Sequence, residues 1–352
     1  MSERQPHIDM LRSVAILFMV EVHTAATFRP QGISASDPLG ILAASIGGLA
    51  APLFICISGW GTKRAMSRRI DAQSGELLRW VAVRFVFLLI AQLLVNLIAL
   101  NIFNWYTPGV LSLLALCALL ALPLSRLKTN HLATLFVLLL LSPMVLASMW
   151  DIDGSWSAVI NADGMIEWLS LLLVDGTYPL FPWLGFFVLG GIIHDMQSKA
   201  ASILLIISGC FSLFALLFAL NTGRAWALTS NGDAVLTFFP ASSAFMITAS
   251  FAVLAAVLLL ARVKPQSFTT PLKQSFQRIG QISLTIYLLH FIPLRIIDEM
   301  GLEPSNTSLA LAVVLGYTLL WWPLASIHHR YAEKMSIETL LRRLSASTRR
   351  PN

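Results

Sequence analysis

The chain has 352 residues, of which 57% are hydrophobic and only 12% are charged, and its mean hydropathy is +0.75. Soluble domains carry about 25% charged residues, so this composition excludes an ordinary soluble protein. The net charge of +6 does not indicate nucleic-acid binding, because a basic excess in a membrane protein usually reports the orientation of its spans.

Apolar stretches recur along the whole chain, and each is long enough to cross about 30 Å of hydrocarbon. They predict an all-α polytopic membrane protein with about ten transmembrane helices. The predicted spans are residues 8–27, 40–62, 81–103, 107–125, 131–149, 177–194, 201–220, 240–261, 281–298 and 307–327. Segment 165–175 is apolar but short, so we interpret it as an interfacial or re-entrant helix.

The charges between the spans predict that both termini are cytoplasmic. The loops after spans 40–62, 107–125 and 240–261 and the C-terminal tail are rich in Lys and Arg, whereas the loops on the opposite side are mostly acidic. Basic loops remain on the cytoplasmic side of a membrane. The sequence therefore predicts a multi-pass protein of the inner or plasma membrane. It has one transmembrane domain at 1–335 and a basic cytoplasmic tail at 336–352.

The first span carries ionisable residues, which are costly at membrane depth and usually functional. From Arg12 to His23 a helix turns by ~1100°, about 20° past three full turns, and rises ~16 Å. The two side chains therefore share one helical face. In one interpretation Arg12 is a snorkelling anchor and His23 bonds to a neighbouring helix. In the other, Arg12 binds phosphate and His23 is a general base.

Two acidic residues of the same span are expected to be structural. Asp9 lies three residues before Arg12, a spacing that predicts an ion pair holding the guanidinium in one orientation. Glu21 lies ~160–180° round the helix from both His23 and Arg12, so it cannot orient His23. We expect Glu21 to find a partner on another helix.

Four segments together resemble a known family. The first span contains Arg12 and His23 separated by ten residues. It is followed by Ala51-Pro-Leu-Phe-Ile-Cys-Ile-Ser-Gly59, Tyr178-Pro-Leu-Phe-Pro-Trp-Leu-Gly-Phe-Phe-Val-Leu-Gly190 and Ile279-Gly-Gln-Ile-Ser-Leu-Thr-Ile-Tyr-Leu-Leu-His290. In this order they resemble the transmembrane acyltransferase superfamily, and within it the heparan-alpha-glucosaminide N-acetyltransferase catalytic-domain-like proteins, which are related to the acyltransferase-three family.

The resemblance implies a membrane acyltransferase that uses cytoplasmic acetyl-CoA. We expect no metal, because the sequence shows no metal-ligand spacing. Its acceptor would be a hydroxyl or amine of a sugar or glycolipid at the opposite face. His23 would be the catalytic base and Arg12 would face the CoA phosphates, because a phosphopantetheine arm is comparable in length to their separation. Ser13 departs from the glycine that the family usually has there, and we expect it to loosen helix packing.

The cytoplasmic cations have two interpretations. Lys63, Arg64, Arg68 and Arg69 follow the second span, and Arg84 lies near the start of the third. They either bind the CoA phosphates or set the topology and contact lipid phosphates.

Three further residues are also open to two interpretations. His290 is a candidate catalytic residue beside His23, with Tyr287 as a substrate-binding neighbour, or the two form a plain interhelical hydrogen-bond node. Trp183 either lines the acceptor entrance or anchors the protein at the membrane interface.

Other classes of membrane protein remain as alternatives. A ten-helix transporter or flippase of a small solute or lipid-linked glycan would show internal repeats and broken helices, and no repeat is evident in the sequence. A structural membrane protein would not need ionisable residues in its first span. The cysteines lie in apolar runs without disulfide or metal spacing, and a homodimer is one arrangement that the sequence allows.

Overall fold

The structure of the protein, a computed structural model, describes residues 5–28, 38–69, 74–149, 152–228, 234–263 and 270–346. Most of the predicted outer loop 28–39 and the last part of the tail, 347–352, lie outside these residues.

The described part of the chain is almost entirely helical, which confirms the predicted all-α membrane fold. Along the chain the elements are α1 (Pro6–Thr27), α2 (Pro38–Ser67), α3 (Ser74–Ile98), α4 (Val110–Arg126), α5 (Thr129–Met149), α6 (Trp156–Ile160), α7 (Met165–Ser170), the π-helix η1 (Leu171–Asp175), α8 (Leu180–Asp195), α9 (Ser198–Thr222), β1 (Ala225–Leu228), β2 (Ala234–Thr237), α10 (Ser243–Ala261), α11 (Pro271–Gln281), α12 (Ser283–Leu289), α13 (Phe291–Glu299), α14 (Thr307–Tyr331), the 3-10 helix η3 (Glu333–Met335) and α15 (Ile337–Ala346). The two strands pair in parallel, with Ala225 opposite Ala234.

Seven described helices are long and apolar enough to cross a membrane. Two bent pairs, α7–η1 with α8 and α11 with α12–α13, raise the number to nine if each pair is one span. Helix α4 corresponds to predicted span 107–125, but it has only 17 residues. The exact count of ten spans and the cytoplasmic placement of both ends therefore stay predictions.

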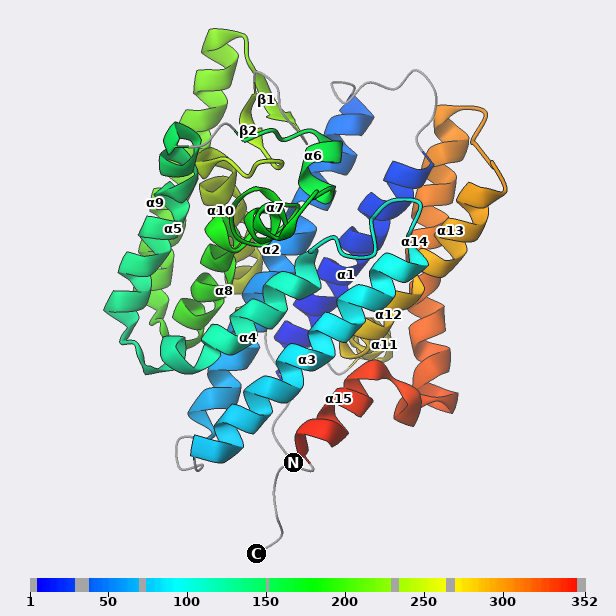
Figure 1. The fold of residues 1–352 in the computed structure, drawn as a ribbon, viewed down its shortest axis with the longest axis horizontal. Helices are drawn as coiled ribbons and strands as arrows, with labels where there is room; N and C mark the ends of the chain where they lie inside the picture. The colour runs from blue at the N-terminus through cyan, green and yellow to red at the C-terminus, as the bar shows by residue number, and fades with distance from the viewer. Residues whose placement is uncertain are drawn as a thin grey trace, which may run out of the picture. The chain divides into compact units, whose positions relative to one another are not determined.

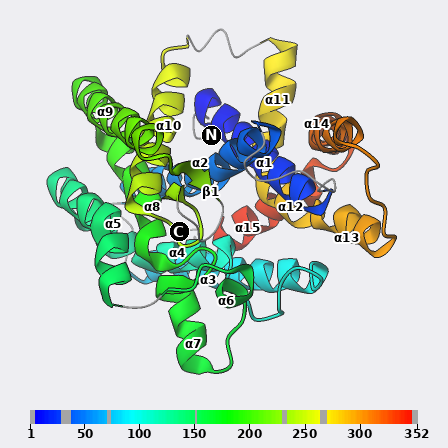
Figure 2. The ribbon, with the colours of Figure 1, turned by 90° about the horizontal axis from the view of Figure 1, so that it is seen from above.

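The chain divides into two compact units. The first comprises Met1–Phe54 and Ala255–Arg343, and the second comprises Ile55–Leu254 and Leu344–Asn352. In the first unit, α1 packs against α11, α12, α13 and α14, and Figures 1 and 2 show these helices gathered round it. The unit thereby joins the first span to segments near the end of the sequence.

The contact between α1 and α11 is close because Gly280 has no side chain. A Cβ atom on Gly280 would overlap the backbone carbonyl of Asp9. Beside it, the buried Ser13 hydroxyl accepts a hydrogen bond from the Gly280 N–H at 2.9 Å and lies 2.7 Å from the Phe276 carbonyl, to which it can donate. The expectation that Ser13 loosens this packing is therefore wrong, since its hydroxyl bridges the two helices.

Replacing Gly280 by alanine is expected to lower the thermal stability of the purified protein. The added methyl meets backbone, which cannot yield as a flexible side chain would, and overpacking of this kind costs about 1–3 kcal/mol. The matched control is Gly316→Ala in α14, where a Cβ meets nothing within 4 Å. That change is expected to raise stability by about 0.5–1 kcal/mol. Thermal unfolding in detergent measures both, and equal unfolding temperatures for the two variants would contradict the close contact.

The predicted span 281–298 corresponds to α12 and α13, which follow α11 across a sharp bend. Helix α11 begins at Pro271 and meets the α12–α13 segment at an angle of 63°. The break lies at Ile282, whose backbone has φ −122° and ψ 31°. A break of this kind leaves the first N–H groups of α12 without partners from the preceding turn.

Glu338 of α15 supplies those partners. Its Oε1 accepts hydrogen bonds from the backbone N–H groups of Leu284 and Thr285 at 2.6 and 3.2 Å. Its Oε2 accepts from the Thr285 hydroxyl at 2.7 Å, and the Thr285 oxygen accepts from the Ile337 N–H at 2.9 Å. A carboxylate is favourable at a helix N-terminus.

The division into a domain at 1–335 and a tail at 336–352 stays a prediction. The part of the tail that contains Glu338 is hydrogen-bonded to α12.

In the second unit, α3 packs on α4, and α8 packs on both α4 and α5. The second half of α2 crosses α8 where two glycines allow the backbones to approach. A Cβ at Gly59 would overlap the Phe187 carbonyl, and a Cβ at Gly190 would overlap the Cys56 carbonyl. Small residues at membrane helix contacts permit such approach. These glycines end two of the four segments that carry the family resemblance, so the segments meet in space.

Candidate functional site: a hydrogen-bonded histidine pair

The structure brings His23 and His290 together. His23 lies near the end of α1, and His290 occupies the joint between α12 and α13. The Nδ1 atom of His23 is 2.8 Å from the Nε2 atom of His290. The rings are nearly parallel, at 11° with centroids 5.0 Å apart. Both imidazoles therefore belong to one site in the first unit.

His290 is held on its other side by backbone. Its Nδ1 atom is 3.1 Å from the Ile286 carbonyl oxygen, and the Tyr317 hydroxyl donates to the His290 carbonyl at 2.6 Å. The side chain has no exposed surface. The first contact holds the ring against α12, and the second ties the backbone of His290 to α14.

The partners assign the protons of the neutral pair. A carbonyl oxygen only accepts, so His290 carries its proton on Nδ1 and leaves Nε2 as an acceptor. His23 must then donate from its own Nδ1–H to that acceptor. The Nε2 atom of His23 is left with its lone pair, which is the form that a general base requires.

Aromatic rings enclose the pair. The Phe291 ring centroid lies 4.7 Å from that of His23 and 4.1 Å from that of His290. Tyr287 lies 5.8 Å from His290 and 6.5 Å from His23, so it neighbours the pair as the sequence predicts. Tyr287 and Phe291 are buried, whereas His23 is only half-buried. His23 is thus the member of the pair with surface available to a substrate.

Arg12 lies on the same helix, closer to its start. It forms the predicted ion pair with Asp9, at 3.3 Å, and 35% of its side chain remains exposed. The guanidinium therefore keeps donors available for a ligand. Glu21 is buried, and its Oε2 atom has no hydrogen-bond partner among the described residues. The structure does not show the expected partner for that oxygen.

The predicted CoA-binding cations in the last turns of α2 and just after it belong to the second unit and contact protein groups there. Lys63 pairs with Asp195 at 3.1 Å and donates to the Ser125 carbonyl at 3.3 Å. Arg64 lies over the ring of Trp60, 5.2 Å from its centroid. Lys63 and Arg64 therefore stabilise the packing of the second unit through these contacts, and their binding to phosphate is a separate question.

Trp80 is the second contact point for this group of cations. Arg69 and Arg84 lie 5.1 and 4.7 Å from the centroid of its ring, and Arg69 also donates to the Ala65 carbonyl at 2.9 Å. Arg68 is exposed in the turn that follows α2. The role of all five cations in CoA binding stays a prediction.

Trp183 lies in the second unit and is fully buried. Tyr178, Phe238 and Phe245 surround its ring, with centroids at 5.0, 5.0 and 5.9 Å. An interfacial anchor would be exposed to lipid headgroups, so this interpretation does not fit. The Nε1 atom has no hydrogen-bond partner among the described residues. Its role as an acceptor contact stays a prediction.

Sequence reasoning missed the residues that hold the site together. Tyr317, the Ile286 carbonyl and Glu338 have no motif that marks them, because their roles depend on contacts between distant segments. In the described part of the chain, no group of three or more His, Cys, Asp or Glu side chains could hold a metal ion.

The fold and this histidine pair define a multi-pass α-helical membrane protein. Two of its histidines, from different helices, form a hydrogen-bonded pair. Residues 4–204, more than half of the chain, match the family of the heparan-alpha-glucosaminide N-acetyltransferase catalytic domain. The chain therefore belongs to this family of membrane acetyltransferases, as its motifs indicate. A comparison with curated proteins finds none that matches. His290 lies beyond the matched residues.

Proposed function

We propose that the protein transfers an acetyl group from cytoplasmic acetyl-CoA to an amine or hydroxyl of a sugar-like acceptor at the extracytoplasmic face of the cell membrane. The observation that carries the proposal is the hydrogen bond from His23 to His290, which leaves His23 Nε2 basic. The acceptor follows from the family, which is named for N-acetylation of a heparan alpha-glucosaminide.

In the proposed reaction, the amine nitrogen or hydroxyl oxygen of the acceptor attacks the thioester carbonyl. At the same time His23 Nε2 takes the proton from that nitrogen or oxygen. The carbon–sulfur bond then breaks, and the imidazolium returns the proton to the departing CoA sulfur. His290 touches no reacting atom. It accepts the hydrogen bond from His23 Nδ1–H, which keeps the ring in the productive tautomer and strengthens when His23 becomes cationic.

Arg12 is the proposed contact for a CoA phosphate. The helix separates it from His23 by ~16 Å, a distance that a phosphopantetheine arm can span. Its exposed donors support this assignment. In the same proposal a set of cations lies on the cytoplasmic side, where CoA enters: Lys63, Arg64, Arg68, Arg69 and Arg84. Trp183 and Tyr287 are the proposed contacts of the acceptor or the acyl group.

Binding of radiolabelled acetyl-CoA to the purified protein tests this assignment. The wild type is expected to bind saturably, and Arg12→Ala is expected to weaken binding by about tenfold or more, because a charged hydrogen bond contributes about 1.5–3 kcal/mol. His23→Ala should bind as well as the wild type. Arg79→Ala, which removes an exposed cation from α3, is the matched control.

Two outcomes would contradict the proposed function. The first is a wild-type protein that shows no detectable acetyl-CoA binding. The second is movement of a solute across vesicles without consumption of acetyl-CoA, which would favour the transporter alternative.

A further inference from the structure

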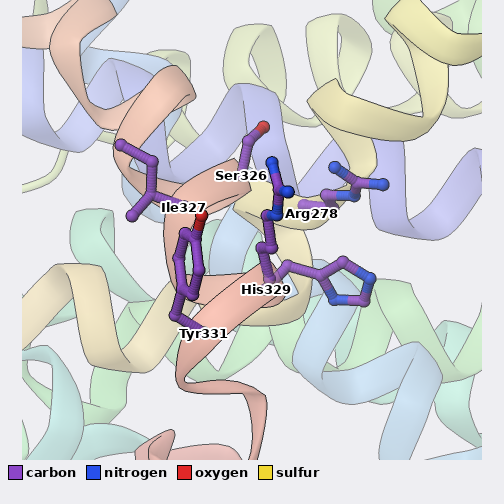
Figure 3. Close-up of a pocket in the computed structure, with 6 residues that line it drawn as sticks. Arg278, Ser326, Ile327, His329 and Tyr331 are labelled. Atoms are coloured by element: carbon purple, nitrogen blue, oxygen red, sulfur yellow. The ribbon is translucent and has the colours of Figure 1, made fainter.

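A basic hollow opens where α11 and α14 pack together in the first unit. Its volume is roughly 510 Å³, and it is lined by Arg278, Ser326, Ile327, His329, Arg330 and Tyr331. Figure 3 shows these side chains round the opening, with Arg278 reaching in from α11 and the rest from the last turns of α14. None of these residues has a part in the proposed acyl transfer.

In the part of the chain that the structure describes, the two arginines of the hollow lack an acidic partner. Within the described residues no ion pair reaches Arg278 or Arg330, and Arg330 only lies over the neighbouring Tyr331 ring at 5.3 Å. His329 is 3.8 Å from Glu333, a contact between two exposed side chains. Like charges that converge on one hollow repel each other, so the site is suited to an anion.

An apolar stripe on α14 leads into the same hollow. Leu320, Leu324, Ile327 and Tyr331 are between 39% and 74% exposed. Their spacing places them on one face of the helix, and the last two also line the hollow. A ligand that occupies the hollow and also covers the stripe needs an anionic headgroup joined to an apolar chain.

We propose that the hollow binds the phosphate of an anionic phospholipid, whose acyl chain lies along the α14 stripe. Guanidinium groups bind phosphate oxygens through paired hydrogen bonds, and the hydroxyls of Ser326 and Tyr331 can add donors. The predicted topology places the end of α14 at the cytoplasmic leaflet, where anionic lipids collect and basic pockets between membrane helices bind their headgroups. CoA also carries phosphates, but its acetyl group is too short to cover the stripe.

Native mass spectrometry of the full-length protein in mild detergent tests the proposal. The probes are phosphatidylglycerol and phosphatidylcholine with identical acyl chains. We expect the wild type to retain phosphatidylglycerol preferentially. Arg278→Ala combined with Arg330→Ala should weaken that binding by about tenfold or more, since two charge-assisted contacts are lost. Lys334→Ala combined with Arg343→Ala removes two exposed cations from the following segment and should leave binding unchanged.

Two additions keep the result decisive. Arg278→Lys keeps the charge but not the paired donors, so an intermediate loss is expected even if the double variant folds poorly. Excess acetyl-CoA should not displace the lipid. Equal retention of both lipids by the wild type, or unchanged retention by the double variant, would overturn the proposal. Displacement by acetyl-CoA would assign the phosphate to CoA and overturn it as well.

Discussion

Replacing His23 by alanine is expected to lower acetyl transfer by roughly 100- to 10,000-fold, the usual contribution of a general base. The loss should appear in kcat rather than in the affinity for acetyl-CoA, because the imidazole acts on the acceptor proton and Arg12 remains in place. A residual rate should persist from the orientation of the two bound substrates.

The measurement is the transfer of radiolabel from acetyl-CoA to glucosamine by the purified protein. His131→Ala is the control, since His131 is exposed on α5 and its loss should leave the rate unchanged. His23→Gln keeps a donor for His290 but supplies no base, so it should be as impaired as the alanine variant. A His23→Ala protein with wild-type turnover would show that another group accepts the proton.

Replacing His290 by phenylalanine is expected to be the second most damaging change. It removes the acceptor of the hydrogen bond from His23 Nδ1–H. The His23 ring can then carry its proton on Nε2, the atom that must be unprotonated to act as the base. A wrong tautomer costs about 10,000-fold in a Ser-His-Asp triad, where the partner is an anion. With a neutral imidazole as partner we expect a loss of roughly 10- to 1,000-fold.

Three comparisons separate orientation of His23 from a merely structural role. The His290→Phe variant should lose kcat while its KM for acetyl-CoA is retained. His290→Gln offers an amide oxygen as an acceptor and should restore part of the rate. Tyr317→Phe removes only the bond to the His290 backbone carbonyl, so it should have a small effect. Equal losses in all three variants would indicate that the ring matters for packing alone.

Local pattern was enough to find the parts of this site. The ionisable residues in the first span identify Arg12 and His23 as candidates. The three-residue spacing of Asp9 and Arg12 predicts an ion pair, and the structure has it at 3.3 Å. His290 is a candidate because it ends the fourth segment of the family resemblance, three residues after Tyr287. Each of these inferences depends on one stretch of sequence and the geometry of one helix.

The features that could not be predicted depend on contacts between distant segments. Helix α11 reads as a loop, because Lys273, Gln277 and Arg278 make it too polar for a span, yet it packs on α1 through Gly280. The first span alone gives the wrong expectation for Ser13 for the same reason, since the Ser13 hydroxyl finds its partners on α11. The pairing of Lys63 with Asp195 likewise depends on how α2 and α8 cross.

The bond between His23 and His290 joins residues 267 positions apart, which has a consequence for biosynthesis. Chains grow at about 5–20 residues per second, so His23 exists for on the order of 10–50 s before its partner is made. During that interval the first span, with its charged and imidazole groups, must remain in the translocation machinery or the bilayer without its partner helices. A ribosome that stalls before α12 leaves a chain with the base and no means of orienting it, and the matched residues 4–204 expressed alone would be such a chain.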